Sequence, residues 1–403
     1  MLLLDLTHTS HTRARTGIQR VARALQQNLS STALPITRDP FVGAWRQLEP
    51  WERTNLAISQ GGEKRKAQWP ASAKWRGRLR RVFGRARHHA LQGEYAGLIE
   101  PELFGPLVAR DLPKLFAHVR GPRIALFLDA IPLRFPELTP PGTVARFPGY
   151  LQELIMFDGI AAISEESRDS LLGYWQWLGV AQHPPVHALP LGVDLERSPT
   201  STPSPSIGAK VPESASAACS TDMPIVLCVG TLEGRKNHLQ LLDACEQLWA
   251  RQAKFQLHVI GHVNAETGGA ALARLRALQA AGRPLRYDGP GTDEAIVQAY
   301  ADSAFTVYPS IAEGFGLPVI ESLARGKPCI CSARGALGEI SLHGGCVALD
   351  QLDAGHIALA IASLLESPEK LSALSDVAQG RAFKSWADYS GELIAWMQSL
   401  PRR

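Results

Sequence analysis

Short apolar runs alternate along this chain with longer stretches that have helical spacing. Ile124 to Leu128 and Ile225 to Val229 are continuous apolar runs of five residues, which is typical of strands buried on both faces of a parallel sheet. Between such runs, apolar residues recur at intervals of three and four, as over residues 18–25, and this spacing predicts helices. Strands that alternate with helices indicate an α/β fold.

A segment poor in large apolar residues divides this pattern in two. Residues 197–222 are rich in Ser, Pro, Thr and Ala, so they cannot form a core of their own. The alternation restarts after them, and 403 residues are enough for two domains. We predict a first domain over residues 1–194, with a final helix over 385–403 that packs back on it. A linker over 195–222 and a second domain over 223–384 complete the division.

The most informative stretch follows a short apolar run that ends at Tyr308. Glu313-Gly314-Phe315-Gly316 makes a tight glycine turn, and Pro318 then opens a helix. The first N–H groups of a helix have no partner inside it, so this turn suits an anionic group. Glu313 and Glu321 would repel that anion, and we therefore expect them to bind hydroxyl groups. An anion beside hydroxyl groups describes a sugar nucleotide, whereas the alternative is a structural turn with surface glutamates.

A second turn in the same half carries two cations. Arg235 and Lys236 follow the strand Ile225 to Val229 and stand directly before a helix. Arginine can bind two phosphate oxygens at once and lysine adds a point charge, so the pair suits a diphosphate. Both turns come after strands, which places them at the carboxyl edge of one sheet. A surface pair of cations is the alternative.

Two residues of the first half are further candidates for a ligand site. Asp129 stands at the carboxyl end of the strand Ile124 to Leu128, where open α/β sheets bind ligands. Gly17 stands where the first loop meets the first helix, and a glycine there lets a ligand approach the backbone closely. A turn or capping aspartate and a plain turn glycine are the alternatives.

Several classes of protein are disfavoured by what the chain lacks. It has no G-x-G-x-x-G, no G-x-x-x-x-G-K-[ST] and no Asp-x-Asp, so we expect no dinucleotide cofactor, P-loop or divalent metal. The six cysteines form no C-x-x-C pair, which disfavours zinc and disulfides. No apolar run reaches about 18 residues, and residues 1–5 are too short for a signal-peptide core. We therefore expect a cytoplasmic protein.

The positive charge is concentrated in one segment. Residues 64–87 hold ten Lys and Arg and no acid, although the net charge of the whole chain is only +4. Within residues 73–89, four large apolar residues share one face of a predicted helix: Trp75, Leu79, Val82 and Phe83. A basic amphipathic helix suits the surface of an anionic membrane. The cations that we expect to contact membrane or acceptor are Arg78, Arg80, Arg81 and Arg85. A solvated loop is the alternative, and no nucleic-acid-binding signature supports nucleic acid as a partner.

Two of these motifs resemble a known family. Val229-Gly-Thr-Leu-Glu-Gly-Arg-Lys-Asn237 and the stretch from Tyr308 to Glu321 are similar to motifs of retaining GT-B glycosyltransferases, in glycosyltransferase family 4. The second is similar to that family's E-x7-E motif. Weaker likenesses lie at Thr16 to Arg20, Asp129 to Pro132, Leu191 to Asp194 and around Trp386. The first of these looks most like bacterial mannosyl- and rhamnosyltransferases that build surface polysaccharides.

The resemblance implies two Rossmann-like domains that face a central cleft, with the acceptor on the first domain and the donor on the second. It implies that Gly17 backs the donor diphosphate and that Arg235 and Lys236 neutralise this diphosphate as it leaves. Glu313 would hold hydroxyls of the transferred sugar, Glu321 would bind the ribose, and Asp129 would lie near the sugar. The backbone of Gly314, Phe315, Gly316 and Leu317 would orient sugar and phosphate.

The implied reaction transfers a hexose from GDP-mannose or dTDP-rhamnose to a glycan acceptor, lipid-linked if the basic segment binds membrane, with retained anomeric configuration and no metal. One departure from the family pattern concerns the contact near the reacting carbon, because Leu128 stands where the family often has histidine. Two rivals stay open: a sugar-nucleotide epimerase of the same fold, and a non-catalytic partner that keeps only the nucleotide site.

Overall fold

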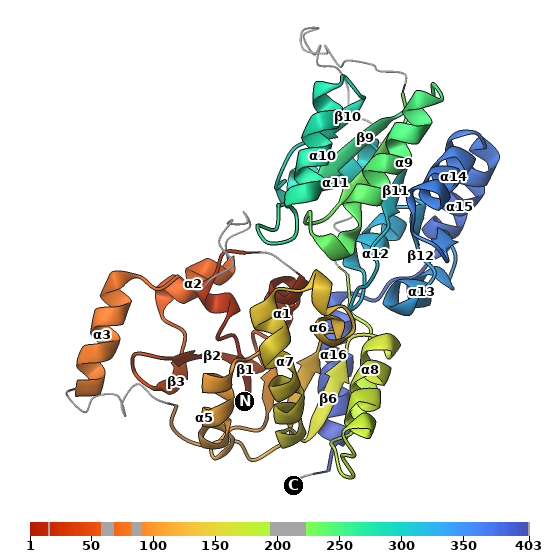
Figure 1. The fold of residues 1–403 in the computed structure, drawn as a ribbon. Coiled ribbons are helices and arrows are strands. Elements are labelled where there is room, and N and C mark those ends of the chain that lie inside the picture. The colour runs from red at the N-terminus through yellow and green to blue at the C-terminus, as the bar shows by residue number, and fades with distance from the viewer. Residues whose placement is uncertain (15–16, 58–67, 83–90, 194–222, 402–403) are drawn as a thin grey trace, which may run out of the picture.

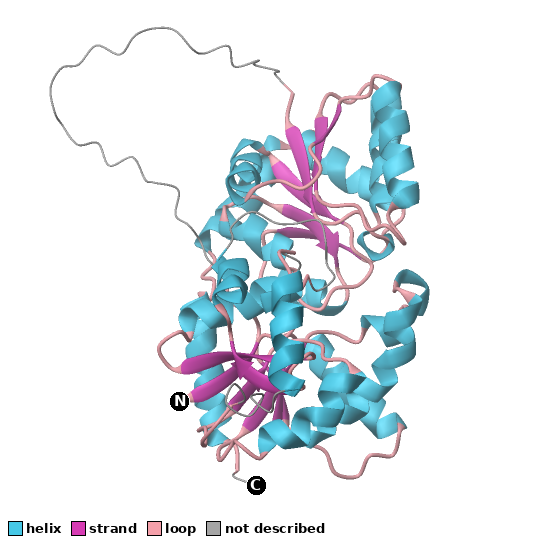
Figure 2. Ribbon diagram, turned by 90° about the vertical axis from the view of Figure 1, so that its left-hand side faces the viewer, coloured by secondary structure: helices cyan, strands magenta, loops and turns pink. Residues whose placement is uncertain are grey.

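The computed structural model describes residues 1–14, 17–57, 68–82, 91–193 and 223–401. They form two α/β domains, the N-terminal one below the C-terminal one in Figure 1. In each domain a central sheet is covered by helices (Figure 2). The predicted linker over 195–222 and Arg85 lie outside the described residues.

The N-terminal domain is built on a sheet of seven strands in the order β3-β2-β1-β4-β5-β6-β7. All neighbours are parallel except β2 and β3. The strands are β1 (Leu2–Asp5), β2 (Ala33–Asp39), β3 (Ala44–Gln47), β4 (Leu98–Glu100), β5 (Arg123–Phe127), β6 (Gly159–Ala162) and β7 (Val186–Ala188). The α-helices are α1 (Gly17–Asn28), α2 (Pro50–Ala57), α3 (Ala71–Val82), α5 (Pro106–Phe116), α6 (Ile131–Arg134), α7 (Pro141–Glu153) and α8 (Glu165–Trp177). The 3-10 helices are η1 (Thr9–His11), η2 (Pro136–Leu138) and η3 (Leu154–Met156).

The C-terminal domain has a fully parallel sheet of six strands in the order β10-β9-β8-β11-β12-β13. The strands are β8 (Ile225–Val229), β9 (Gln256–Ile260), β10 (Leu285–Tyr287), β11 (Phe305–Tyr308), β12 (Cys329–Ser332) and β13 (Cys346–Leu349). The helices are η4 (Gly234–Lys236), α9 (His238–Ala250), α10 (Gly269–Ala280), α11 (Asp293–Asp302), α12 (Leu317–Ala324), α13 (Gly335–Ser341), α14 (Ala354–Leu365), α15 (Pro368–Gly380) and α16 (Trp386–Ser399). The predicted α/β architecture with two parallel-sheet domains is thus observed.

The strand order of each sheet reverses direction at one point. In the C-terminal domain the order runs outward from β8 to β9 on one side and from β11 to β12 on the other. Ligands of open α/β sheets bind in the crevice at such a point, outside the carboxyl ends of the strands. The loops that follow β8 and β11 flank this crevice, and they carry the two predicted turns.

The last helix of the chain belongs in space to the first domain. α16 packs on α1, and Met397 and Leu400 share a core cluster with Leu4 and Leu25. Figure 1 shows α16 among the helices of the N-terminal domain. An added Cβ on Gly97 would lie 2.2 Å from the Met397 methyl carbon, so the helix fits closely against β4. The chain therefore crosses between the domains twice.

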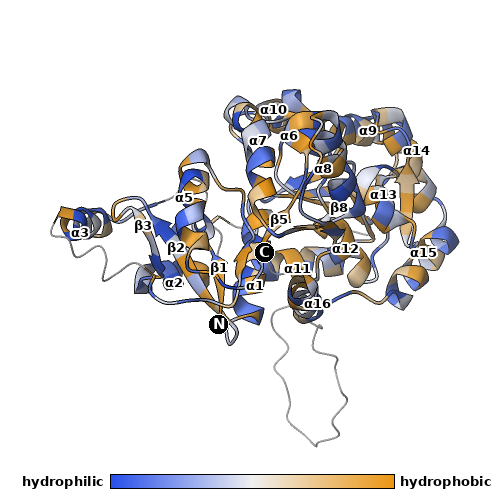
Figure 3. Ribbon diagram, turned by 90° about the horizontal axis from the view of Figure 1, so that it is seen from below, coloured by the Kyte–Doolittle hydropathy of each residue, from blue (hydrophilic) through white to orange (hydrophobic). Residues whose placement is uncertain are grey.

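The basic helix α3 packs on the domain through its small residues and leaves its large apolar residues exposed. Its small residues Ala73 and Gly77 are buried, and Gly77 lies against Phe41, where an added Cβ would come within 2.7 Å of the Phe41 Cβ. The large residues Trp75 and Val82 are 66% and 78% exposed. Figure 3 shows α3 at the outer edge of the molecule, with hydrophobic and hydrophilic positions interleaved. The helix ends at Val82, so the predicted helical residues 83–89 lie outside the described part.

Candidate functional site: a cleft between the two domains

The site is centred on the two turns of the C-terminal domain. Arg235 and Lys236 lie in η4, in the loop after β8, and Glu313 lies in the loop after β11. β8 and β11 are neighbours in the sheet, so both loops leave the same edge side by side. The N–H of Ile311 donates to the carbonyl of Arg235 at 2.8 Å, which fixes one loop on the other. The structure therefore brings Lys236 into contact with Glu313, which is 77 positions away in the sequence.

Glu313 lies between the two cations. Its Oε2 is 2.7 Å from Nη1 of Arg235, and its Oε1 is 2.5 Å from Nζ of Lys236. Oε1 also accepts a hydrogen bond of 3.2 Å from the hydroxyl of Tyr308, which itself contacts Lys236. Glu233 holds the other end of the Arg235 guanidinium at 2.8 Å. The cations are thus held in fixed positions before any ligand arrives.

Electrostatics keep Glu313 ionised. Burial raises the pKa of this carboxyl, but the charges of Arg235 and Lys236 outweigh burial and lower the pKa to about 2. Burial lowers the pKa of Lys236, and the adjacent Glu313 opposes that shift. At neutral pH, Glu313 therefore carries no proton that it could donate, and it can act only as a hydrogen-bond acceptor and counter-ion.

The contacts also limit what Glu313 can hold. A carboxylate offers about four lone-pair positions on its two oxygens. Oε1 already accepts from Lys236 and Tyr308, whereas Oε2 accepts from Arg235 alone among the described residues. Without displacing a protein group, Glu313 therefore has room for one sugar hydroxyl, at Oε2.

A cavity of about 330 Å³ lies between the domains beside this carboxylate. Glu313, Ile311 and Ala312 form its wall on the C-terminal side, while Asp129 and Arg134 line it from the N-terminal side. Arg235 and Lys236 do not line the cavity themselves. They contact Glu313, which does. Of the predicted site residues, Glu313 and Asp129 thus meet at this cavity, one from each domain.

Asp129 occupies the position that its strand predicts. It follows β5 at the carboxyl edge, and its Oδ1 accepts from the N–H of Ile131 at 3.0 Å. Burial raises the pKa of Asp129, and the positive charge of Arg235 opposes that rise. Asp129 therefore combines a turn-forming hydrogen bond with a place in the cleft wall, and the structure shows both at once.

The glycine of the central turn allows the domains to touch. A Cβ added to Gly314 would lie 2.2 Å from the carbonyl oxygen of Leu128 and 3.1 Å from the Cβ of Asp129. The Gly314 carbonyl accepts from the hydroxyl of Ser164 at 2.7 Å and from that of Ser167 at 3.3 Å. Ser164 is also the N-cap of α8, as its sequence position predicts. Nothing in the sequence predicts that Ser164 also donates a hydrogen bond to a residue of the other domain.

The other residues of this turn serve mainly to shape it. Gly316 has a φ of +107°, and an added Cβ would lie 2.5 Å from a Leu337 methyl carbon, so only glycine fits without strain. The side chains of Phe315 and Leu317 are buried in the core. For these residues only the backbone is left to face a ligand, as the resemblance implies.

Glu321 is engaged in a contact that the sequence did not predict. It forms an ion pair with Arg20 of α1, across the domain boundary, and lies 3.5 Å from the hydroxyl of Tyr300. Gly17 opens the same helix one turn earlier, and no atom lies within 4 Å of where its Cβ would be. The first turn of α1 therefore faces α12. A ribose bound to Glu321 would share this carboxylate with Arg20 or displace it.

A further carboxylate holds the two domains together beside the cavity. Glu339 of α13 accepts hydrogen bonds from the N–H groups of Glu165 at 3.1 Å and Glu166 at 2.6 Å. These N–H groups open α8 and have no partner inside it. A negative charge at a helix N-terminus is favourable, so this contact stabilises the observed arrangement of the domains.

The predicted membrane cations do not form one free cluster. Arg80 lies 2.9 Å from the carboxylate of Glu49, the residue before α2, and Arg76 lies 3.0 Å from the same carboxylate. The Arg78 guanidinium lies over the Phe41 ring, 5.7 Å from its centre. Arg81 is exposed. None of these side chains belongs to the cleft lining, and no helix among the described residues is long and apolar enough to cross a membrane.

The C-terminal domain matches a known family model. Residues 213–381 match the family described as Glycosyl transferases group 1. The serotype-specific mannosyltransferase WbdA of Escherichia coli is 27% identical over 348 residues, which cover 82% of this chain but 38% of that protein. The O-antigen chain mannosyltransferase B of E. coli is 32% identical over 171 residues, 42% of this chain and 44% of that one. The match thus covers less than half the length of each of these two curated relatives.

Solved structures share the whole fold at low sequence identity. Anabaena HepE, crystallised with UDP and glucose, has a TM-score of 0.66 at 13% identity, with 99% of both chains covered. Sucrose-phosphate synthase of Thermosynechococcus elongatus has a TM-score of 0.61 at 15% identity, covering 98% of this chain and 97% of that one. The chain therefore has the GT-B architecture, and its residues 213–381 match a glycosyltransferase group 1 domain, as the motifs around Arg235 and Glu313 predict.

Proposed function

We propose that the chain transfers a mannosyl unit from a nucleotide-diphosphate sugar to a glycan of a bacterial surface polysaccharide. One observation carries this proposal: Glu313, which holds the cations Arg235 and Lys236, faces Asp129 across the inter-domain cavity. The likeness to two E. coli mannosyltransferases supports the sugar and the process. The N-terminal domain would bind the acceptor and the C-terminal domain the donor.

The chemistry follows from where charge develops. As the bond between the anomeric carbon and the phosphate oxygen breaks, negative charge grows on the diphosphate, and fixed cations stabilise it. Arg235 and Lys236 supply two such charges, so the proposed transfer needs no metal. A new bond forms between that carbon and the acceptor hydroxyl on the same face of the sugar, and the hydroxyl proton moves to the leaving phosphate oxygen. Glu313 accepts a sugar hydroxyl at Oε2 and keeps its negative charge throughout.

The donor is tested by ligand-induced stabilisation. A ligand that binds only the folded state at 100 times its Kd stabilises by about 2.7 kcal/mol, which is readily seen as a rise in Tm. We expect GDP and GDP-mannose to raise Tm in the presence of EDTA, with dTDP and dTDP-rhamnose as the next candidates and UDP as the comparison. A rise in Tm with none of them, with or without Mg²⁺, would contradict the nucleotide site.

Transfer is separated from its two rivals by the fate of the donor. A transferase releases the nucleotide diphosphate only when an acceptor is present, whereas an epimerase changes the sugar without an acceptor. A non-catalytic partner would bind the donor and leave it intact with every acceptor. Leu128, in the place of a frequent histidine, is the residue that favours this last alternative. Nuclear magnetic resonance of the product would also show whether the anomeric configuration is retained.

We extend the proposal to a position at the inner face of the cytoplasmic membrane, with a lipid-linked acceptor. α3 turns Trp75, Leu79 and Val82 outward among its cations, and these three side chains are 66%, 44% and 78% exposed. Such a surface suits an anionic bilayer. In flotation with phosphatidylglycerol vesicles, we expect Trp75→Ser with Leu79→Ser to abolish association. Trp177→Ser, at a 79% exposed tryptophan on α8, is the matched control. Equal flotation of all variants would contradict this part of the proposal.

A further inference from the structure

The N-terminal domain contains a second cavity, separate from the inter-domain cleft. It has a volume of about 390 Å³ and lies between η1, α2 and the residues that precede α3. Its lining consists of His11, Arg13, Trp51, Thr54, Asn55, Gln68, Trp69 and Pro70. None of these residues takes part in the donor site described above, and none was singled out by the sequence motifs.

Three rings form the wall of this cavity. The imidazole of His11 stacks on Trp51 at 5.5 Å between ring centres and approaches Trp69 at 4.0 Å, while the two indoles meet edge to face at 5.5 Å. Both tryptophans are half-buried, so part of each ring surface is accessible. Large aromatic side chains left partly open beside polar groups are typical of a small-molecule site.

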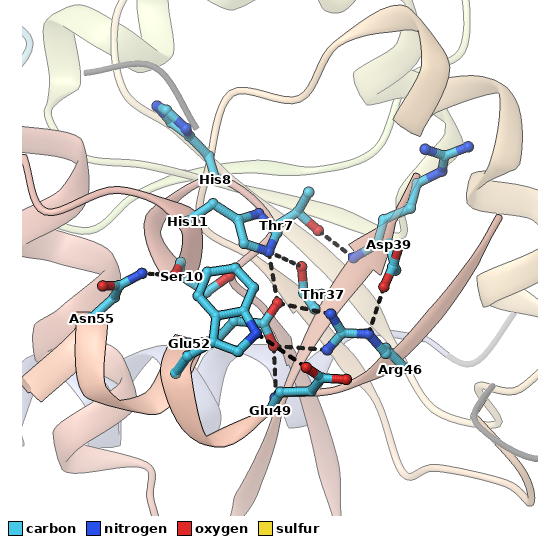
Figure 4. A network of polar contacts seen from close by, with 12 residues as sticks. Thr7, His8, Ser10, His11, Thr37, Asp39, Arg46, Glu49, Glu52 and Asn55 are labelled. Atoms are coloured by element: carbon cyan, nitrogen blue, oxygen red, sulfur yellow. Dashed lines mark hydrogen bonds and ion pairs between the residues drawn. The ribbon is translucent and has the colours of Figure 1, made fainter. Parts of the chain in front are cut away.

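A buried ionic network fixes His11, the central ring of the three, in place. His11 Nε2 is 2.7 Å from Glu52 Oε1, and the guanidinium of Arg46 binds both Glu52 oxygens at 2.7 and 2.9 Å. Asp39 accepts from Arg46 at 2.9 Å. Figure 4 shows these side chains pointing toward one another behind His11. All four side chains are at most 3% exposed. Burying so many charges stabilises a protein little, so the network serves to hold one geometry.

The polar groups of the lining define the ligand. Arg13, Thr54 and Gln68 are exposed at the cavity and offer donors and acceptors, and no carboxylate is among the described residues that line it. The face of a hexose carries C–H groups that pack on an indole, while its hydroxyls need hydrogen-bond partners at the edge. Indole faces combined with hydroxyl, amide and guanidinium groups fit a hexose better than a lipid chain, which needs no polar partners.

The cavity also lies in a suitable place for a glycan. η1 follows the carboxyl end of β1, and Asp129 follows the carboxyl end of β5, two strands away in the sheet. Neighbouring strands are about 4.8 Å apart, so the ends of β1 and β5 are roughly 10 Å apart along this edge. The cavity extends from η1 toward β2, where His11 contacts Thr37, and therefore lies farther from Asp129 than β1 does. In Figure 1, α2 lies at the end of the N-terminal domain that faces the C-terminal domain.

We propose that this cavity is a subsite for a hexose unit of the acceptor glycan, remote from the unit that receives the transferred sugar. This inference rests on the proposed function for the acceptor's identity, but binding at the subsite needs no catalysis. The subsite would favour acceptors of several sugar units over single sugars, and it would do so through the acceptor KM alone.

Direct binding tests the subsite without donor. The probes are α-mannopentaose and mannose, titrated into the full chain by calorimetry. We expect saturable binding of the pentaose, weakened at least tenfold by Trp69→Ala and by Trp51→Ala, and unchanged in the Trp177→Ala control. Thr54→Tyr, at an exposed helical position on the cavity rim, should block the cavity while leaving the ring stack intact, so it decides the matter if a tryptophan variant unfolds. Absence of pentaose binding to the wild type would overturn the proposal, as would binding by Thr54→Tyr and the tryptophan variants that is as tight as that of the wild type.

A kinetic experiment separates the subsite from the proposed function. With GDP-mannose and p-nitrophenyl mannosides of one and four sugar units, we expect Trp69→Ala to raise KM about tenfold for the longer acceptor only. The donor KM and the kinetics with the one-unit acceptor should stay the same. Equal effects on both acceptors would overturn the subsite. If the wild type shows no transfer but binds the pentaose through Trp51 and Trp69, the proposed function fails while the subsite stands.

Discussion

The close approach of Gly314 to the N-terminal domain yields the sharpest prediction. In Gly314→Ala the new Cβ would lie 2.2 Å from the carbonyl oxygen of Leu128. A carbon and a carbonyl oxygen ordinarily lie about 3.3 Å or more apart. The obstacle is backbone, which cannot rotate away as a side chain can, so the turn must retreat from Asp129 by about 1 Å.

This retreat acts on the geometry of the cleft more than on folding. Glu313 is the neighbour of Gly314, so its carboxylate moves away from Asp129 with the turn, and the hydrogen bond from Ser164 to the Gly314 carbonyl lengthens. A displacement of about 1 Å in an active site can reduce the rate by about 100-fold, which corresponds to about 2.7 kcal/mol of transition-state stabilisation. We therefore expect kcat/KM to fall by about two orders of magnitude.

The assay is the release of nucleotide diphosphate in the presence of acceptor, with kcat and the donor KM measured separately. Gly173→Ala is the matched control, because Gly173 is an exposed glycine in α8 with no atom within 4 Å of its Cβ position. Thermal unfolding of both variants checks that they are folded. A Gly314→Ala variant with the kinetics of the wild type would refute the view that this contact between the domains forms the working cleft.

Three further predictions concern charged groups. Glu313→Gln leaves the buried Lys236 without its counter-ion and Arg235 with Glu233 alone, and it should cost about 3–5 kcal/mol in urea unfolding; unchanged stability would contradict the ionic account. Burial raises the pKa of Glu102 to about 7, so the folded state keeps a proton that the unfolded state loses above about pH 4.5. Stability should therefore fall as pH rises from about 4.5 to about 7, and Glu102→Gln should flatten that decline; a slope that is unchanged in the variant would contradict it. Arg20→Ala should change stability by only about 0–1 kcal/mol, because Arg20 is 39% exposed, and should mainly alter the donor KM through Glu321. A loss of several kcal/mol would show that this ion pair holds the domains together.

The architecture and the centre of the site could be predicted because they depend on local rules. Apolar runs and helical spacing identified the strands and helices, and the carboxyl ends of parallel strands share one edge. Arg235, Lys236 and Glu313 stand in loops that follow strands of one sheet, so their convergence followed from the topology of that sheet, whereas the approach of Asp129 from the other domain was implied only by the family resemblance. The roles assigned to these residues are still predictions that the experiments above address.

The contacts that depend on the approach of distant segments could not be predicted. The pairing of Arg20 with Glu321 joins residues 301 positions apart in different domains, and no spacing rule covers such a distance. The stack of His11, Trp51 and Trp69 likewise needs η1, α2 and the segment before α3 to meet.

In α3 the sequence pattern identified the helix but not the face through which it packs. Gly77 gives the backbone room to pack on Phe41. The large apolar residues of α3 point outward because its small residues, Ala73 and Gly77, form the buried face of the helix.

The central claim is that Arg235 and Lys236 bind a nucleotide diphosphate without a metal. Isothermal titration of GDP into the full chain in EDTA tests it most directly, with Arg235→Ala and Lys236→Ala as variants. Arg274→Ala, which removes a partly exposed arginine of α10 paired with Asp243 and Glu246, is the control. Because hydrogen bonds to charged groups contribute about 1.5–3 kcal/mol, each variant should weaken binding by about 10- to 100-fold, with the control unchanged. Binding that requires Mg²⁺, or that is equal in all variants, would contradict the claim.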